Sequence, residues 1–187
     1  MNLHRMLKAR KAEGNPLRVG LIGAGKFGSM VLAQAQRIPG LHVVGVADLD
    51  LAKARASLAR VGWPEERYAA LSLAEAFKGG GTCVLDDARA LAAFDGIECI
   101  IEATGHPIAG IRHALAAIEG GKHVVMVNVE ADVLCGPVLA AKARAKGLVY
   151  SMAYGDQPAM ICELVDWVRS CGFELVSAGK GMNFEPR

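Results

Sequence analysis

Three glycines spaced as G-x-G-x-x-G are the residues of this sequence best suited to chemistry. Gly23, Gly25 and Gly28 directly follow an apolar run at 19–22. A buried strand that ends in such a turn presents backbone N–H groups and the positive end of the next helix to a ligand, and these groups bind the pyrophosphate of a dinucleotide. The pattern therefore predicts a cofactor-binding turn, in which Lys26 and Phe27 also contact the cofactor where the helix begins.

An acidic residue stands where the ribose of a dinucleotide needs one. Asp48 ends a second apolar run and lies about 20 residues beyond Gly28. Its carboxylate is suited to accept hydrogen bonds from the adenosine ribose and to repel a 2′-phosphate, so the sequence favours NAD. NADP stays open because Lys53 and Arg55 follow on the next helix. For Asp48 itself the alternative is a helix cap after a structural turn.

Polar residues also follow two later apolar runs, which are expected to form strands. Ligands of open α/β sheets bind at the carboxyl ends of the strands. Four loops are therefore expected to frame the nicotinamide, namely 23–28, 104–107, 128–130 and 154–157.

The residues in these loops suggest separate roles. Thr104, Gly105 and Asn128 are expected to place the nicotinamide, and His106 to donate a proton to a carbonyl group of the substrate. Glu130 is expected to orient a substrate hydroxyl. The alternatives are that His106 caps or packs the following helix, and that Asn128 and Glu130 only serve a helix start.

Lys180 is a further catalytic candidate. It stands between Gly179 and Gly181, after an expected strand at 173–178. This position suits the binding of a substrate anion or a proton transfer.

The elements that must hold these residues alternate between short apolar runs and helical segments. This pattern predicts an α/β fold of the Rossmann type, with a doubly wound, mostly parallel six-stranded sheet. Expected helices include one at 138–146 and one with a buried face of Ile108, Ile111, Leu115 and Ile118. The expected domains are an N-terminal helical arm at 1–15, an NAD(P)-binding domain at 16–154, and the start of a substrate domain at 155–187.

Composition narrows the class of protein. The 187 residues are 52% hydrophobic and 5% aromatic, and the formal net charge is only +2, so nucleic-acid binding has little support. The five cysteines form no C-x-x-C pair, which predicts reduced thiols, a cytoplasmic location and no metal site. No apolar stretch is long enough to span a bilayer. The basic segment 3–12 is expected to pack against the domain or a partner subunit, with a membrane anchor as the alternative.

Several motifs resemble a known family. With the glycine turn, Glu102-Ala103-Thr104-Gly105 and the segment 121–128 resemble the NAD(P)-binding domain of homoserine dehydrogenases. Val129 and Glu130 stand where those enzymes follow the asparagine with a lysine. The segments 1–7, 128–132, 153–158 and 179–181 resemble homoserine-dehydrogenase-like oxidoreductases that carry a C-terminal SAF domain, some of them similar to deoxyxylulose-phosphate reductoisomerase. This resemblance implies a sugar-phosphate or polyol-derived substrate.

Together these features predict the NAD(P)-binding portion of an oxidoreductase. It would transfer a hydride between nicotinamide and a small hydroxy or carbonyl compound, as part of a longer protein and inactive by itself. The alternative is a non-catalytic module that senses NAD(P) or binds a partner. A small-molecule substrate and a homo-oligomer are the expected partners, without nucleic acid or membrane.

Overall fold

The computed structural model describes residues 2–153 and 157–179. The chain forms two compact units, Met1–Ser151 and Met152–Arg187. The predicted six strands are present. They are β1 (Leu17–Ile22), β2 (Leu41–Ala47), β3 (Cys83–Leu85), β4 (Cys99–Glu102), β5 (His123–Met126) and β6 (Tyr150–Met152).

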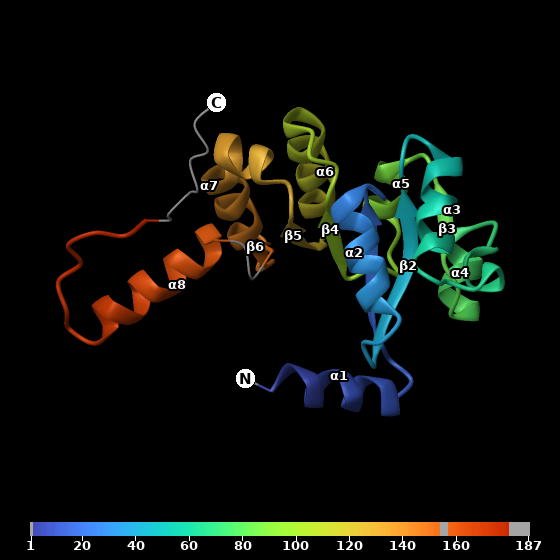
Figure 1. The fold of residues 1–187 in the computed structure, drawn as a ribbon, viewed down its shortest axis with the longest axis horizontal. Helices are drawn as coiled ribbons and strands as arrows, with labels where there is room; N and C mark the ends of the chain where they lie inside the picture. Colours follow the sequence, from blue (N-terminus) through green and yellow to red (C-terminus); the bar gives the residue numbers. More distant parts are fainter. Residues whose placement is uncertain (1, 154–156, 180–187) are drawn as a thin grey trace. The chain divides into compact units, whose positions relative to one another are not determined.

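These strands form one sheet in the order β3-β2-β1-β4-β5-β6 (Figure 1). β1 pairs in parallel with both β2 and β4, and the pairs β2–β3 and β4–β5 are also parallel. The strand order reverses between β1 and β4, which is the switch point where Rossmann folds bind nucleotides. The predicted fold class is therefore confirmed.

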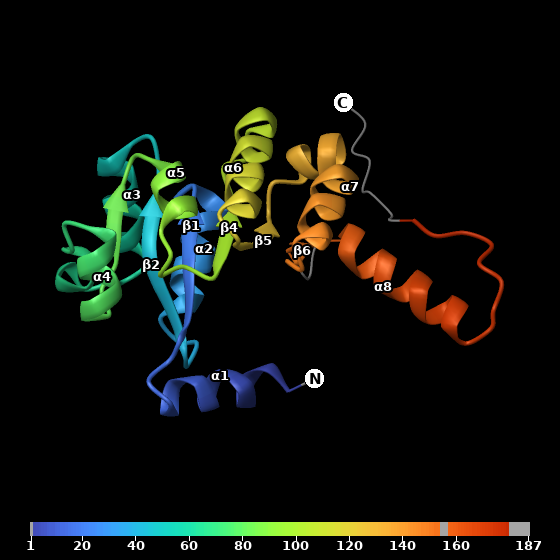
Figure 2. The same cartoon turned by 180° about the vertical axis from the view of Figure 1, so that it is seen from behind.

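Helices of the first unit cover both faces of this sheet. The helices of the described residues are α1 (Leu3–Ala12), α2 (Lys26–Ala35), α3 (Leu51–Arg60), η1 (Glu65–Tyr68), α4 (Leu73–Gly79), α5 (Ala88–Ala93), α6 (Pro107–Glu119), α7 (Val129–Ala145) and, in the second unit, α8 (Gln157–Ser170). α2 lies in front of the sheet in Figure 1, and α5 and α6 lie in front in the reverse view of Figure 2. Two apolar cores result, one including Leu21 and Leu32 and the other including Ile100 and Met126.

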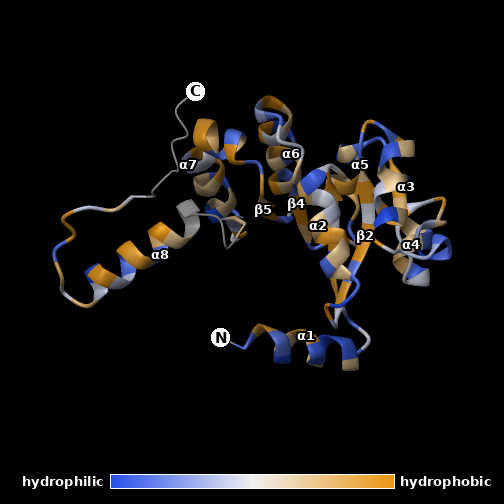
Figure 3. Ribbon diagram, in the orientation of Figure 1, coloured by the Kyte–Doolittle hydropathy of each residue, from blue (hydrophilic) through white to orange (hydrophobic). Residues whose placement is uncertain are grey.

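Residues 3–12 form the helix α1, and an ion pair joins it to the residue before β4. The Arg10 guanidinium donates to both carboxylate oxygens of Glu98, at 2.8 and 2.9 Å. α1 buries none of its residues and is largely hydrophilic in Figure 3, whereas the strands are mostly hydrophobic. Among the described residues, no helix combines the length and the apolar character needed to cross a membrane.

Two predicted elements are wrong. Residues 173–178 form no strand, because no other described strand pairs with them, and Phe173 and Val176 are 65% and 94% exposed. α7 begins at Val129 rather than at 138. The helix continues through Pro137 because Pro137 and Val133 are both exposed, so that water can bond the carbonyl oxygen that the proline leaves unpaired.

The buried face predicted for α6 is also wrong in part. Ile118 is buried, but Ile108 is 49% exposed. Gly110, Ala114 and Ala117 complete the buried face instead. Small residues there let α6 and α7 approach closely, which apolar periodicity alone does not reveal.

Thiol burial gives the first testable prediction. Burial raises the pKa of the Cys99 thiol to about 11, so this thiol stays protonated at pH 8 and is a poor nucleophile. Iodoacetamide at pH 8 should modify the exposed Cys162 and Cys171 of the folded chain and leave the buried Cys83 and Cys99 intact. Peptide mass spectrometry measures this, and a denatured sample is the control. Equal alkylation of Cys99 and Cys171 before unfolding would contradict the structure.

Candidate functional site

The glycine turn between β1 and α2 packs tightly on one side and is open on the other. Gly23 has a φ of +96°, and a Cβ there would lie 2.8 Å from the carbonyl carbon of Ala103. A Cβ on Gly28 would collide with the carbonyl oxygen of Gly23. By contrast, no atom lies within 4 Å of the position that a Cβ on Gly25 would take. The first and third glycines therefore serve packing, whereas the second faces open space.

The start of α2 lacks a side-chain cap. Its N-cap is Gly25, which offers no side-chain hydrogen bond. Side chains do cap α1, α3, α4, α5, α6 and α7, through Asn2, Asp50, Ser72, Asp87, His106 and Asn128. The first N–H groups of α2 are thus left for another acceptor, and such a helix start favours anions.

Asp48 directs its carboxylate at the same turn. Its Oδ2 accepts a hydrogen bond from the Ala24 N–H at 2.8 Å, and its Oδ1 accepts one from the Asp50 N–H at 3.1 Å. The helix-cap alternative fails for Asp48, because Asp50 caps α3 by accepting from the Lys53 N–H at 2.9 Å. The half-buried Asp48 carboxylate is therefore held beside the glycine turn.

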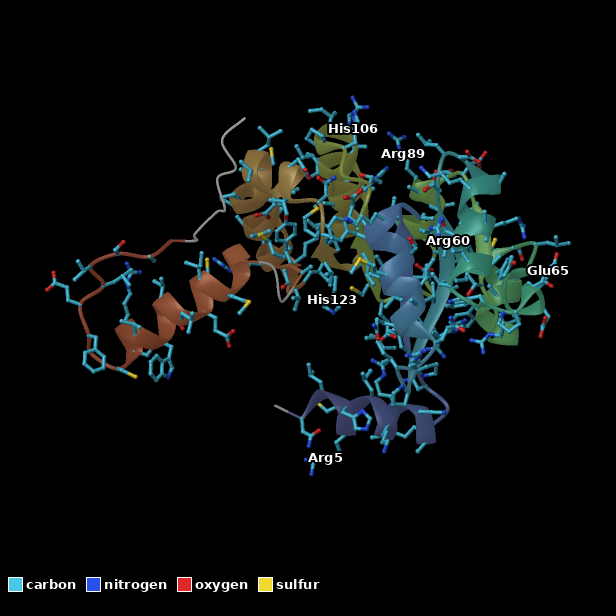
Figure 4. All side chains as sticks on the ribbon, in the orientation of Figure 1. Arg5, Arg60, Glu65, Arg89, His106 and His123 are labelled. Carbon is cyan, nitrogen blue, oxygen red and sulfur yellow. The ribbon has the colours of Figure 1, made fainter. Side chains whose placement is uncertain are left out.

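A cavity of about 620 Å³ opens in front of this turn. It is of the size that small-molecule and cofactor sites have. The predicted site residues Gly23, Gly25, Asp48, Thr104 and His106 all line it. Figure 4 shows His106 and Arg89 toward one end of the first unit and His123 toward the other.

Two of the four loops predicted to frame the nicotinamide, 23–28 and 104–107, contribute to this wall. The cavity takes residues from the ends of β1, β2, β3 and β4 and from α6, and none from 128–130. Residues 154–156 and Lys180 lie outside the described residues. Lys26, Phe27, Gly28, Gly105, Asn128 and Glu130 are not among the lining residues.

The polar residues after β4 are bonded to one another. Asn128, which is 1% exposed, donates from Nδ2 to the His106 carbonyl oxygen at 3.0 Å and to Thr104 Oγ1 at 3.3 Å. Its Oδ1 accepts from the Ala131 N–H at 3.1 Å, which caps α7. The helix-start alternative for Asn128 is therefore the one that the structure shows.

His106 also caps a helix. Its Nδ1 accepts a hydrogen bond from the Ala109 N–H at 3.3 Å at the start of α6. The ring lines the cavity all the same, so the capping alternative does not remove it from the site.

Sequence reasoning missed several residues of the cavity wall. They include Asp86, Asp87, Arg89, Arg112 and His113. Lys53 also lines the cavity, although the sequence pointed to it only as a residue that could favour NADP binding. The sequence did contain one indication that His113 belongs to the site. His113 follows His106 by seven residues, a spacing that places two residues on the same side of a helix.

Comparison with protein families identifies the class of protein. Residues 17–127 match the family described as "Oxidoreductase family, NAD-binding Rossmann fold", which covers more than half of the chain. The chain belongs to this oxidoreductase family. A second family, described as the catalytic domain of the oxidoreductase DRL, matches residues 155–187. No curated protein sequence matches the chain significantly.

Solved structures show the same fold. The chain is similar to a homoserine dehydrogenase from Thiobacillus denitrificans, with 24% identity, a TM-score of 0.57 and coverage of 73% of this chain and 29% of that one. It is similar to a biliverdin reductase from Synechocystis in complex with biliverdin and NADP+, with 20% identity, a TM-score of 0.58 and coverage of 83% and 42%.

A third similar structure is a myo-inositol dehydrogenase from Lactobacillus casei in complex with NAD(H) and myo-inositol. The identity is 18%, the TM-score 0.59 and the coverage 82% of this chain and 42% of that one. The chain thus spans less than half the length of all three proteins.

One tight and one open glycine position make a paired prediction. Gly28→Ala should lower the free energy of unfolding by about 3 kcal/mol, because the new methyl group collides with the Gly23 carbonyl. Gly25→Ala, the matched control, brings no new clash and should lower stability by only about 1 kcal/mol, the cost of alanine at a helix N-cap. Urea unfolding measures both. Equal stability of the two variants would contradict the packing described.

Proposed function

We propose that this chain binds NAD(P) as part of an oxidoreductase that transfers a hydride between nicotinamide and a small hydroxy or carbonyl compound. The observation that carries this proposal is the uncapped start of α2, with open space at Gly25 and the Asp48 carboxylate beside it. Family membership supports it independently.

Each group around the turn has a defined task in this proposal. The free N–H groups of α2 bind the diphosphate, and Gly25 allows the phosphates to approach the backbone. Asp48 accepts hydrogen bonds from the adenosine ribose. The nicotinamide ring supplies the hydride chemistry when it is bound. The chain's own contribution in the first unit is to bind and orient the dinucleotide.

The proposal favours NAD over NADP. Asp48 carries a negative charge close to where a 2′-phosphate would bind, which opposes NADP. Lys53 lines the same cavity and is the group that would favour it. We give more weight to Asp48, because two backbone N–H groups hold its carboxylate at the turn.

An enzyme is favoured over a sensing module. The match of 155–187 to an oxidoreductase catalytic domain is the reason, because a sensor needs no such segment. His106, Glu130 and Lys180 remain the proposed catalytic residues, and a sugar-phosphate or polyol-derived substrate remains the proposed class. The homoserine-dehydrogenase-like grouping is supported by likeness at the level of the fold.

Gly25→Val tests the proposed cofactor site directly. The side chain would occupy the space proposed for the diphosphate, so we expect NADH binding to fall at least 100-fold, or about 2.7 kcal/mol, while thermal stability is retained. NADH fluorescence titration measures binding. Wild-type affinity in a folded Gly25→Val variant would refute the site.

Asp48→Asn tests cofactor preference. The amide oxygen can still accept from the Ala24 N–H, but the charge is gone, so the ratio of NADPH to NADH affinity should rise about tenfold. Asp95→Asn is the control, because Asp95 is exposed and does not line the cavity. An unchanged ratio in Asp48→Asn would show that Asp48 does not read the ribose.

A further inference from the structure

One side chain in the cavity wall has a free hydrogen-bonding atom that no sequence motif marked. His113 lies on α6, seven residues after His106, and lines the cavity. Its Nδ1 lies 3.1 Å from Glu102 Oε1, and its side chain is 20% exposed. No described residue forms a hydrogen bond with Nε2, and this atom is not fully buried. The second ring nitrogen is therefore open to a ligand.

The contact with Glu102 orients the ring. In the arrangement in which a Glu102 carboxylate accepts this hydrogen bond, Nδ1 of His113 is the donor. The ring is then oriented with Nε2 away from Glu102. This is the arrangement by which proteins hold a histidine ready to contact a ligand through its other nitrogen.

Glu102 is costly to keep at this position. Its side chain is completely buried, and Oε1 takes both of its bonds, from His113 and from the Thr104 hydroxyl at 2.6 Å. Oε2 is buried without a partner among the described residues. A buried polar atom that has lost its water and gained no partner opposes folding. A carboxylate that opposes stability in this way points to a task other than holding the fold together.

The other polar groups after β4 cannot take over the contact with a ligand. The Thr104 hydroxyl donates to Glu102 and accepts from Asn128, whose own amide is bonded on both sides. His106 and His113 are the members of this network whose second ring nitrogen forms no hydrogen bond with a described residue, and of the two only His113 has its ring bonded to a buried carboxylate.

We propose that His113 binds the nicotinamide dinucleotide through Nε2, and that Glu102 is the positioning residue that holds its ring. The proposal rests on the proposed function and adds a binding residue outside the glycine turn. The cavity around His113 has polar side chains of both charges, which suits a ligand with both hydrogen-bond donors and acceptors. Its other charged or titratable wall residues are Asp48, Lys53, Asp86, Asp87, Arg89, His106 and Arg112.

Two substitutions separate ligand binding from structure. His113→Asn places an amide nitrogen where Nδ1 was and keeps the bond to Glu102, but it removes Nε2. Glu102→Met removes the acceptor that holds the ring and fills the same space with an apolar side chain, which is often neutral or stabilising in place of a buried charge. Glu102→Gln keeps an acceptor, and it is the conservative variant that should rescue binding.

The experiment titrates the full chain with NADH and, separately, with NADPH, and records thermal stability for each variant. We expect His113→Asn and Glu102→Met to weaken dinucleotide binding about tenfold without a fall in Tm, the loss that one hydrogen bond explains. Glu102→Gln should bind within about threefold of wild type. His4→Asn, on the exposed α1, is the matched control and should bind as wild type does.

Each other result overturns the proposal. Wild-type affinity in His113→Asn would show that Nε2 makes no contact, even though the cofactor site is real. A fall in Tm with unchanged affinity in Glu102→Met would assign Glu102 a purely structural role. If the wild-type chain bound neither NADH nor NADPH, the proposed function would fail as well, so the two failures are distinguishable.

Discussion

The close approach of α2 to the end of β1 is the constraint on which the rest of the site depends. Gly28 lets the helix lie against the Gly23 carbonyl, and Gly23 in turn lies against the backbone after β4. This packing fixes the direction of α2, so that its uncapped start opens onto the cavity rather than onto bulk solvent. A side chain at either position would separate the helix from the sheet and disperse the N–H groups that an anion needs.

The sequence was most informative where function depends on local geometry. The glycine spacing and Asp48 could be read directly, because a turn and the next strand end are specified by residues close together in the chain. The capping of α3 by Asp50 and the bonding of Asn128 could not, because Ser, Asp and Asn serve caps and ligands equally well. The Glu102–His113 pair depends on how α6 lies against β4, and no periodicity encodes that contact.

The network after β4 changes which residues are free to act. The motif around Thr104 suggested a hydroxyl that faces the cofactor, yet this hydroxyl and Asn128 bond each other and Glu102. A polar group that is satisfied within the protein gives little to a ligand unless it breaks an existing bond. In the proposed site, the contact with the ligand is therefore assigned to His113 on α6 and to His106 at the N-cap of α6, and the loop after β4 supports them.

Asp48 is held in place before any proposed cofactor binds. Both carboxylate oxygens already accept backbone N–H groups, from Ala24 and Asp50, so the charge is fixed in place and needs no rearrangement on binding. A ribose with two hydroxyl groups can donate to such a carboxylate at once, whereas a 2′-phosphate must either displace it or accept its repulsion. Lys53, in contrast, carries a flexible side chain that must lose entropy to offset that repulsion. In the proposed site, this preorganised carboxylate is the reason to expect NAD rather than NADP, even though a cation lines the same cavity.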